Sequence, residues 1–323
     1  MSAAPIGLLV MAYGTASGPD GIERYYTDIR GGRSPTPDHV HELKERYAAI
    51  GNVFPLLDTT RAQADGTVRE LNGNADGRRF RAYLGMKHSP PFIPQGVARM
   101  REDGIERAVG IVMAPHWSGM SVETYLDRVD RAAAEGGPSF TFVRGWHDHP
   151  GFIELLAGRV DAALAALERG DREAAAVIFS AHSLPIRMLD DGSERCLRCD
   201  CEPSCRYRDG LRATADLVAG RLGLGPDRVA IAWQSAGRTE DPWWGPALEE
   251  VIVDVAKDGR PAVVVCSAGF VADHLEVLYD LDIQARRIAE DAGIRFARTE
   301  MPNADPAFCK VLASVIRDHL AAS

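Results

Sequence analysis

Four cysteines lie within ten residues near the middle of the chain, in the spacing Cys-x2-Cys-x-Cys-x3-Cys. They are Cys196, Cys199, Cys201 and Cys205. Four thiols on one short loop would be prone to oxidation unless they bind a metal, so the pattern predicts a metal centre. Zinc and an iron–sulfur cluster would both be dianionic with four thiolates, so neither the spacing nor the flanking arginines separate them. The other two cysteines, Cys266 and Cys309, lie in apolar segments and are expected in the core.

A second candidate for chemistry is His182, which follows the apolar run Ile178–Ala181 and precedes Ser183–Pro185. Imidazole titrates near neutral pH and binds first-row metals, so a histidine at the end of a buried strand could be a base or a metal ligand. It could equally be a structural histidine at the edge of a sheet. Position alone leaves both interpretations open.

Three carboxylates follow the segment Cys266–Gly269 at helical spacing. Asp273 is expected at the N-cap or in the first turn of a helix, and Glu276 and Asp280 lie four residues apart on one face. Leucines on the same helix indicate that it is partly buried, and a buried row of like charges is costly unless a cation compensates it. The row therefore predicts a cation-binding face, with a solvated acidic stripe as the alternative.

Short apolar runs alternate with amphipathic stretches along the whole chain. The expected strands are Ile6–Ala12, Arg81–Leu84, Ala108–Ala114, Phe140–Val143, Ala174–Phe179, Val229–Trp233 and Pro261–Cys266. The expected helices are Asp38–Ile50, Pro94–Asp103, Val122–Glu135, Gly151–Arg169 and Gly210–Gly220. Strands that are apolar throughout are typically covered by helices on both faces. The pattern predicts an α/β protein with two doubly wound, parallel-sheet domains.

The turn formers at His149–Gly151 place a domain boundary there, with a first domain of residues 1–149 and a second of residues 150–304. The second domain is expected to carry the Cys-rich loop, residues 190–207, projecting near the entrance of a cleft rather than lying in the core. Asp200, Pro203 and Ser204 would let this loop turn back on itself. Residues 305–323 are expected to form a helix that packs back on the first domain. Ligands of open α/β sheets bind at the carboxyl ends of the strands, which predicts one cleft between the two halves.

The composition limits the class of protein. The chain has 323 residues, of which 46% are apolar and 26% are charged. This balance is typical of an ordinary globular protein. A formal net charge of −9 argues against nucleic acid or an anionic membrane as the main partner. No apolar stretch is long enough for a membrane span, and the first basic residue is Arg24, so the basic region of a signal peptide is missing. We therefore expect a cytoplasmic protein.

Taken together, the motifs resemble the ferrochelatase family. They are Ser180–Pro185, Gly269–Asp280, Trp233–Ser235 with Asp241–Trp243, Tyr83–His88, Ala114–His116 and Glu300–Asn303. They extend over nearly the whole chain. The resemblance implies a lyase with the class II chelatase fold, in which two Rossmann-like domains enclose a porphyrin between them. It implies insertion of Fe²⁺ into a porphyrin in haem biosynthesis.

The resemblance also implies roles for particular residues. His182 and Glu276 would face each other across the cleft, as a neutral imidazole and a carboxylate that accept the pyrrole protons and transiently bind Fe²⁺. Tyr13 resembles the branch that acts on coproporphyrin III to give coprohaem. The rim that would hold the propionates is implied to be Arg30, Arg46, Tyr47 and Tyr125.

Three positions depart from the family pattern. Phe54 stands where a small hydroxyl residue is common, Gly31 replaces a second basic residue, and Gln284 replaces an acid at the outer end of the carboxylate row. These departures put one propionate contact and an accessory cation site in doubt.

Within the family, the chain resembles a bacterial group with four cysteines in one internal segment, which implies a [2Fe–2S] cluster on Cys196, Cys199, Cys201 and Cys205. The alternatives are a protoporphyrin IX ferrochelatase, another tetrapyrrole chelatase, and a non-catalytic haem-binding or iron–sulfur sensor protein. The next enzyme of the haem pathway is expected as a transient partner.

Overall fold

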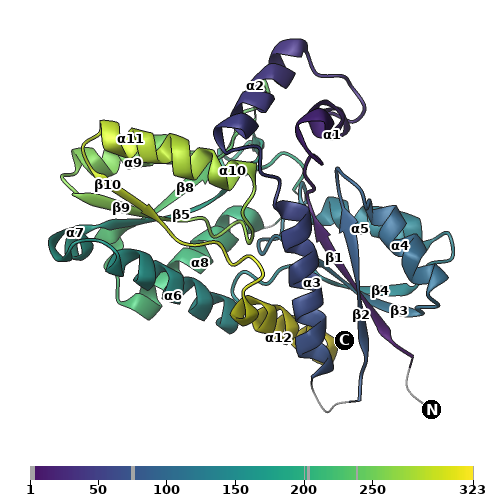
Figure 1. Cartoon of the computed structure of the whole chain (residues 1–323). Coiled ribbons are helices and arrows are strands. Elements are labelled where there is room, and N and C mark those ends of the chain that lie inside the picture. The colour runs from purple at the N-terminus through teal and green to yellow at the C-terminus, as the bar shows by residue number, and fades with distance from the viewer. Residues whose placement is uncertain (1–3, 74–76, 200, 202–203, 238, 323) are drawn as a thin grey trace.

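The computed structural model describes residues 4–73, 77–199, 201, 204–237 and 239–322 (Figure 1). Its first half is built on a four-stranded parallel sheet with the strand order β2-β1-β3-β4. The strands are β1 (Ile6–Ala12), β2 (Phe80–Met86), β3 (Arg107–Val112) and β4 (Ser139–Val143). The central strand β1 is buried on both faces: Leu8 and Val10 pack on one side and Leu9 and Met11 on the other. This alternation is why an unbroken apolar run forms the middle of the sheet.

The second half repeats this architecture, with the strand order β10-β9-β5-β8 and all pairs parallel. Its strands are β5 (Ala176–His182), β8 (Val229–Gln234), β9 (Ala262–Cys266) and β10 (Arg295–Arg298). Strand β5 alternates in the same way, since Val177 and Phe179 pack in one core cluster and Ala176 and Ile178 in another. The predicted α/β fold with two parallel sheets is confirmed.

Helices cover both sheets (Figure 1). Around the first sheet they are α1 (Ile22–Ile29), α2 (Pro37–Ala49), α3 (Leu56–Asn72), α4 (Ile93–Glu102) and α5 (Val122–Ala133). Around the second they are α6 (Pro150–Ala165), α7 (Arg169–Ala174), α8 (Arg206–Leu222), α9 (Leu248–Lys257), α10 (Leu275–Leu278) and α11 (Arg286–Asp291). Both cysteines that were predicted in the core, Cys266 and Cys309, are buried.

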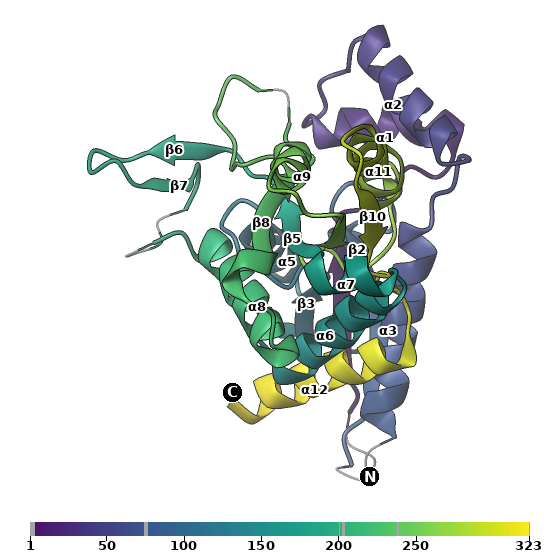
Figure 2. The same ribbon diagram turned by 90° about the vertical axis from the view of Figure 1, so that its left-hand side faces the viewer.

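The C-terminal helix α12 (Pro306–Ala322) lies beside α3 of the first half in both views (Figures 1 and 2). The two helices approach closely at Gly66, where any side chain would overlap the sulfur of Cys309, so glycine is needed there. The side chain of Gln63, on the same helix α3, donates hydrogen bonds of 2.9 Å to the carbonyls of Val271 and Asn303. Helix α3 is therefore fixed to later parts of the chain by both apolar and polar contacts.

A short antiparallel ribbon, β6 (Ile186–Met188) and β7 (Glu194–Cys196), leaves the second half and projects from the body (Figure 2). The sequence did not predict this ribbon, strand β10, or helices α1, α3, α7, α9 and α11. None of the helices in the described ranges has the length and apolar character to cross a membrane.

Candidate active site

His182 and Glu276 face each other across the gap between β5 and α10. His182 is the last residue of β5, and its Nε2 lies 3.5 Å from Oε1 of Glu276. The other ring nitrogen, Nδ1, donates to the carbonyl of Ser183. Each side chain is about one-third exposed, at 31% and 34%. The ring is thus oriented so that Nε2, and not Nδ1, is the nitrogen presented to the site.

His182 and Glu276 shift each other's pKa in opposite directions. Burial favours the neutral imidazole, but the Glu276 carboxylate outweighs it and raises the pKa of His182 above its ordinary value. Burial likewise opposes the charged carboxylate, and yet the imidazolium lowers the pKa of Glu276 below its ordinary value. The carboxylate therefore favours the protonated imidazole and the imidazolium favours the carboxylate, and the expected role of a neutral imidazole as proton acceptor stays a prediction.

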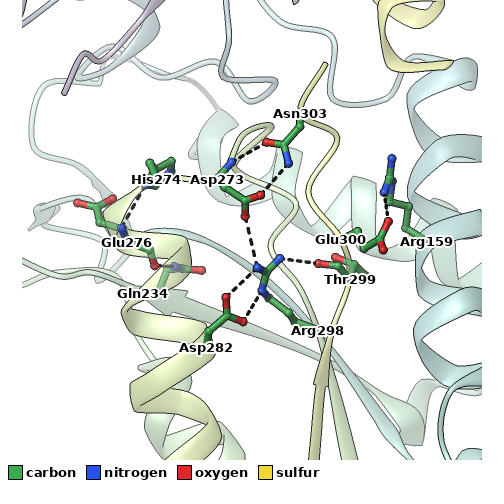
Figure 3. Close-up of polar contacts among 10 residues, drawn as sticks. All are labelled: Arg159, Gln234, Asp273, His274, Glu276, Asp282, Arg298, Thr299, Glu300 and Asn303. Atoms are coloured by element: carbon green, nitrogen blue, oxygen red, sulfur yellow. Dashed lines mark hydrogen bonds and ion pairs between the residues drawn. The ribbon is translucent and has the colours of Figure 1, made fainter. Parts of the chain in front are cut away.

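The local structure explains why Glu276 points at His182. The side chain of His274 caps α10, because its Nδ1 accepts the backbone N–H of Glu276 at 3.2 Å, and Gln234 donates to the carbonyl of Glu276, also at 3.2 Å (Figure 3). The turn before α10 passes close to β5 at Gly269, where an added Cβ would lie 2.6 Å from that of Ala181. Glycine allows this approach, which brings α10 against the end of β5.

The predicted row of three carboxylates is not formed. Asp273 is not the N-cap; its carboxylate pairs with Arg298 at 3.3 Å and accepts from Asn303 at 2.7 Å (Figure 3). Asp280 lies near Glu276, whose negative charge adds to the rise in the pKa of Asp280, and a π-helical turn, Asp280–Ala285, begins at this residue. Asp273 leaves the predicted row because it precedes α10 and pairs with Arg298.

Asp280 forms an ion pair with Arg46 of α2 and accepts a hydrogen bond of 2.5 Å from Ser235. Burial raises the pKa of Asp280 to about 6, although the Arg46 guanidinium opposes this shift. Arg46 also lies over the ring of Tyr279, 4.6 Å from its centroid. The ion pair joins the two halves of the molecule, and Arg46 is engaged in it.

A group of tyrosines from the first half lies opposite Glu276. Burial raises the pKa of Tyr13, Tyr25 and Tyr47, and the negative charge of Glu276 adds to each shift. Tyr13 is 43% exposed at the surface of this group and packs against His88, with ring centroids 4.6 Å apart. Because the charge of Glu276 acts on all three tyrosines, residues of both halves belong to one site. Tyr25 was not singled out in the sequence, because it lies in an amphipathic helix with no local motif.

The other residues that were predicted to hold the propionates lie in different surroundings. Tyr47 stacks on Phe54 with centroids 4.5 Å apart, so this departure from the family pattern fills the space beside Tyr47 with an aromatic ring. Tyr125 is buried beneath Lys87, whose ammonium lies 5.0 Å from its ring centroid. Arg30 lies over Tyr26, and within the described ranges no hydrogen bond or ion pair connects it to another predicted rim residue. Gln284 donates to Glu249 at 3.2 Å.

The four clustered cysteines are all buried, so the expectation that the loop would not lie in the core is wrong for their side chains. They pack into the main core cluster with Tyr207 and Trp244. The sulfurs of Cys196 and Cys205 lie 3.3 Å apart, and Cys199 and Cys201 are joined as a disulfide. Asp200 and Pro203, two of the predicted turn formers, lie outside the described residues.

In this arrangement, no group of three or more His, Cys, Asp or Glu side chains surrounds a common point in the part of the chain that the structure describes. The donor set nevertheless fits a four-thiolate centre. Four sulfurs share one buried cluster. N–H groups of Trp244 and Cys201 donate to the sulfurs of Cys196 and Cys199, both at 3.3 Å. Such donors are typical of thiolates that bind iron, and the cysteines could hold such a centre once Cys199 and Cys201 are reduced.

A hollow of about 480 Å³ lies between α4 and α5 and includes Arg101, Arg128 and Arg131 in its lining. It contains none of the predicted site residues. The site around His182 is instead defined by the side chains that meet there.

The chain matches one protein family over nearly its full length. The sequence profile described as Ferrochelatase matches residues 5–320. "Coproporphyrin III ferrochelatase" of Anoxybacillus flavithermus is 43% identical over 322 residues, covering 99% of this chain and 98% of that protein. The protein of the same name from Bacillus subtilis is 43% identical over 318 residues, covering 98% of each.

Two solved chelatase structures share the fold at low sequence identity. SirB from Bacillus subtilis with Fe³⁺ has a TM-score of 0.57 at 10% identity, covering 98% of this chain and 96% of that chain. CbiX, described as the terminal enzyme for biosynthesis of sirohaem in denitrifying bacteria, has a TM-score of 0.52 at 12% identity, covering 97% and 98%. These two likenesses support the fold, and the full-length relatives support the family.

Proposed function

Because the chain belongs to the ferrochelatase family, we propose that it is a coproporphyrin III ferrochelatase, which inserts Fe²⁺ into coproporphyrin III to give coprohaem. The observation that carries this proposal is the full-length identity of 40–44% to several proteins of that name. The facing pair of His182 and Glu276 supports the chemistry.

We assign the proton and metal chemistry to His182 and Glu276 together. Insertion releases two pyrrole protons and requires Fe²⁺ to exchange its water ligands for four ring nitrogens. Nε2 of His182 is the nitrogen directed at the site, and Glu276 lies beside it as a second base and an oxygen ligand. With the imidazole neutral, the pair can accept pyrrole protons while Fe²⁺ enters the ring.

The coproporphyrin specificity is assigned to Tyr13, Arg30, Arg46, Tyr47 and Tyr125. Coproporphyrin carries four propionates, and guanidinium and phenol groups are suitable partners for them. Arg46 lies between Asp280 and the ring of Tyr279, so a propionate would compete with Asp280 for its guanidinium. This competition would couple substrate binding to the contact between the two halves.

Anaerobic Fe²⁺ insertion tests the proposed substrate. Purified protein should metallate coproporphyrin III much faster than protoporphyrin IX, which has only two propionates. Equal or reversed rates would contradict the specificity. Coproporphyrin insertion that is normal in His182→Ala would contradict the catalytic assignment.

We also propose that Cys196, Cys199, Cys201 and Cys205 hold a [2Fe–2S] cluster. The support is the buried set of four sulfurs and the N–H groups directed at two of them. When bound, the cluster would cross-link the segment through four iron–thiolate bonds; the proposed reaction assigns it no electron transfer. Anaerobically reconstituted protein should contain two irons and two acid-labile sulfides per chain and be reddish-brown. Colourless protein with one zinc per chain would contradict the cluster, although the four cysteines would still be the metal ligands. Replacing Cys266 should leave the colour unchanged.

The remaining expectations stand as proposals. We propose domains of residues 1–149 and 150–304 with a C-terminal helix from residue 305, supported by the two separate sheets and the packing of α12 on α3. A cytoplasmic location and a transient contact with the next haem-pathway enzyme are also proposed, from the sequence alone.

A further inference from the structure

The cysteine segment is connected to His182 at its first end through Trp244. The indole Nε1 of Trp244 donates to the sulfur of Cys196 at 3.3 Å, and the carbonyl of Trp244 accepts from the hydroxyl of Ser183 at 2.8 Å. Ser183 follows His182 directly and provides the carbonyl that holds its Nδ1. Three hydrogen bonds therefore lead from the sulfur to the imidazole ring.

The other end of the segment reaches His182 through Tyr207. Cys205 is the residue before α8, and Tyr207 lies in the first turn of that helix. Its hydroxyl donates to the carbonyl of His182 at 2.8 Å. Tyr207 and Trp244 are only 7% and 4% exposed. Water therefore cannot easily replace these bonds if they are lost.

These two connections, here called tethers, hold the backbone of His182 and Ser183, which determines where the imidazole points. The N–H of Ser183 is also fixed, because it donates to the carbonyl of Gln234 at 2.7 Å. With its own carbonyl and the next residue held, His182 has little freedom to turn Nε2 away from Glu276. An imidazole displaced by even about 1 Å would lose much of its effect as a base or ligand.

We propose that Trp244 and Tyr207 are positioning residues, through which an intact cysteine segment keeps His182 aimed at Glu276. This inference rests on the proposed function, in which His182 is catalytic. It gives the cysteine segment a mechanical role in the reaction that does not depend on which metal the sulfurs hold. Loosening the segment would release both tethers together.

The packing of the segment against the first half offers an independent way to disturb it. On this side, the carbonyl of Arg198 lies only 2.5 Å from where a Cβ on Gly119 would be. The guanidinium of Arg206 covers the ring of Trp117, 4.5 Å from its centroid. Gly119→Ala should therefore push the segment away without contacting His182, and should produce the same defect as loss of a tether.

The test uses conservative variants with matched controls. Tyr207→Phe keeps the buried ring and removes its hydroxyl, whereas Trp244→Phe removes the indole N–H and leaves a smaller ring, a loss of volume that Trp146→Phe matches. Tyr83→Phe and Trp146→Phe remove equivalent buried donors that bond to Asp103 and Val112 in the first half. Turnover is measured as anaerobic Fe²⁺ insertion into coproporphyrin III, together with hydrogen exchange of the Ser183 amide by mass spectrometry.

Each tether variant should lower kcat about 5- to 20-fold with KM for porphyrin within about twofold, and should speed exchange of the Ser183 amide. The control variants should change neither. Combining Trp244→Phe with Cys196→Ser should be no worse than the more severe single variant, because both interrupt one path. Unchanged kcat and exchange in the tether variants, or multiplicative losses in the combination, would overturn the proposal.

Failure of the proposed function gives a different result. If the wild-type chain inserts no iron, the function is wrong, whereas the exchange measurement still reports whether the tethers hold His182. If the wild type is active and the tether variants behave as their controls, only the tethers are wrong. Should Cys196→Ser fail to fold, Gly119→Ala combined with Trp244→Phe replaces it with the same expectation.

Discussion

Replacing Glu276 by glutamine should lower the pKa of His182 while preserving the shape of the site. The carboxylate and Nε2 lie 3.5 Å apart. Two unit charges at this separation interact by about 1 kcal/mol in water and about 5 kcal/mol at an effective dielectric constant of about 20. Both side chains are about one-third exposed. We therefore take an intermediate value of about 2 kcal/mol, which corresponds to an about 30-fold change in proton affinity.

The assay is an NMR titration of the imidazole in metal-free protein, with the His182 resonances identified from their loss in His182→Ala. The pKa of His182 should fall in Glu276→Gln, and iron insertion should decrease about 100-fold or more because one member of the base pair is gone. Glu300→Gln is the control, since Glu300 is exposed and pairs with Arg159 away from the site (Figure 3). An unchanged or higher pKa in Glu276→Gln would refute the reasoning that this carboxylate raises the pKa of His182.

Three further predictions concern single substitutions. His182→Ala should lower kcat by about 10²–10⁴-fold with porphyrin binding retained, and near-normal turnover would contradict its role. In the wild type, burial raises the pKa of Asp280 to about 6. The free energy of unfolding should therefore fall by about 2–3 kcal/mol as pH rises from about 4 to about 6. In urea titrations, the stability of Asp280→Asn should not show this fall with pH, and its turnover should be reduced less than that of Glu276→Gln. The same pH dependence of stability in wild type and Asp280→Asn would contradict the prediction. Gly66→Ala should destabilise the protein by about 1–3 kcal/mol in urea, because its Cβ would overlap Cys309, whereas the exposed Gly170, with open space around it, should tolerate alanine.

Much of the fold could be predicted from the sequence because the buried strands are apolar on both faces. The expected strand Ile6–Ala12 matches β1 residue for residue, the expected strand Pro261–Cys266 ends where β9 ends, and the expected strand Ala174–Phe179 stops short of the end of β5 at His182. Helix α3 was missed because its buried face includes Thr60, Gln63 and Thr67, which a hydrophobic pattern does not register. Its burial depends on α12, which lies at the other end of the chain.

The site could be predicted only where a motif marks a residue. The sequence suggested His182 and Glu276, and spacing suggested that Asp280 would share the helix face of Glu276. The contacts of Asp280 with Arg46 and Ser235 involve distant segments, so no local period reveals them. The roles of Trp244 and Tyr207 are also non-local, since each contacts residues from distant segments.

The packing of α12 on α3 also determines when the first half of the protein can finish folding. During synthesis, everything from Gly73 to Ala322 must be added after α3 before the whole of α12 exists. At roughly 5–20 residues per second, this takes about 12–50 s. Throughout that time the face of α3 that carries Gly66 has no helix to cover it, and apolar contacts of α12 such as Phe308 and Leu312 are missing. The nascent chain should therefore depend on chaperones that shield this face, and ribosomes stalled before codon 306 should carry a first half that is readily cut by protease.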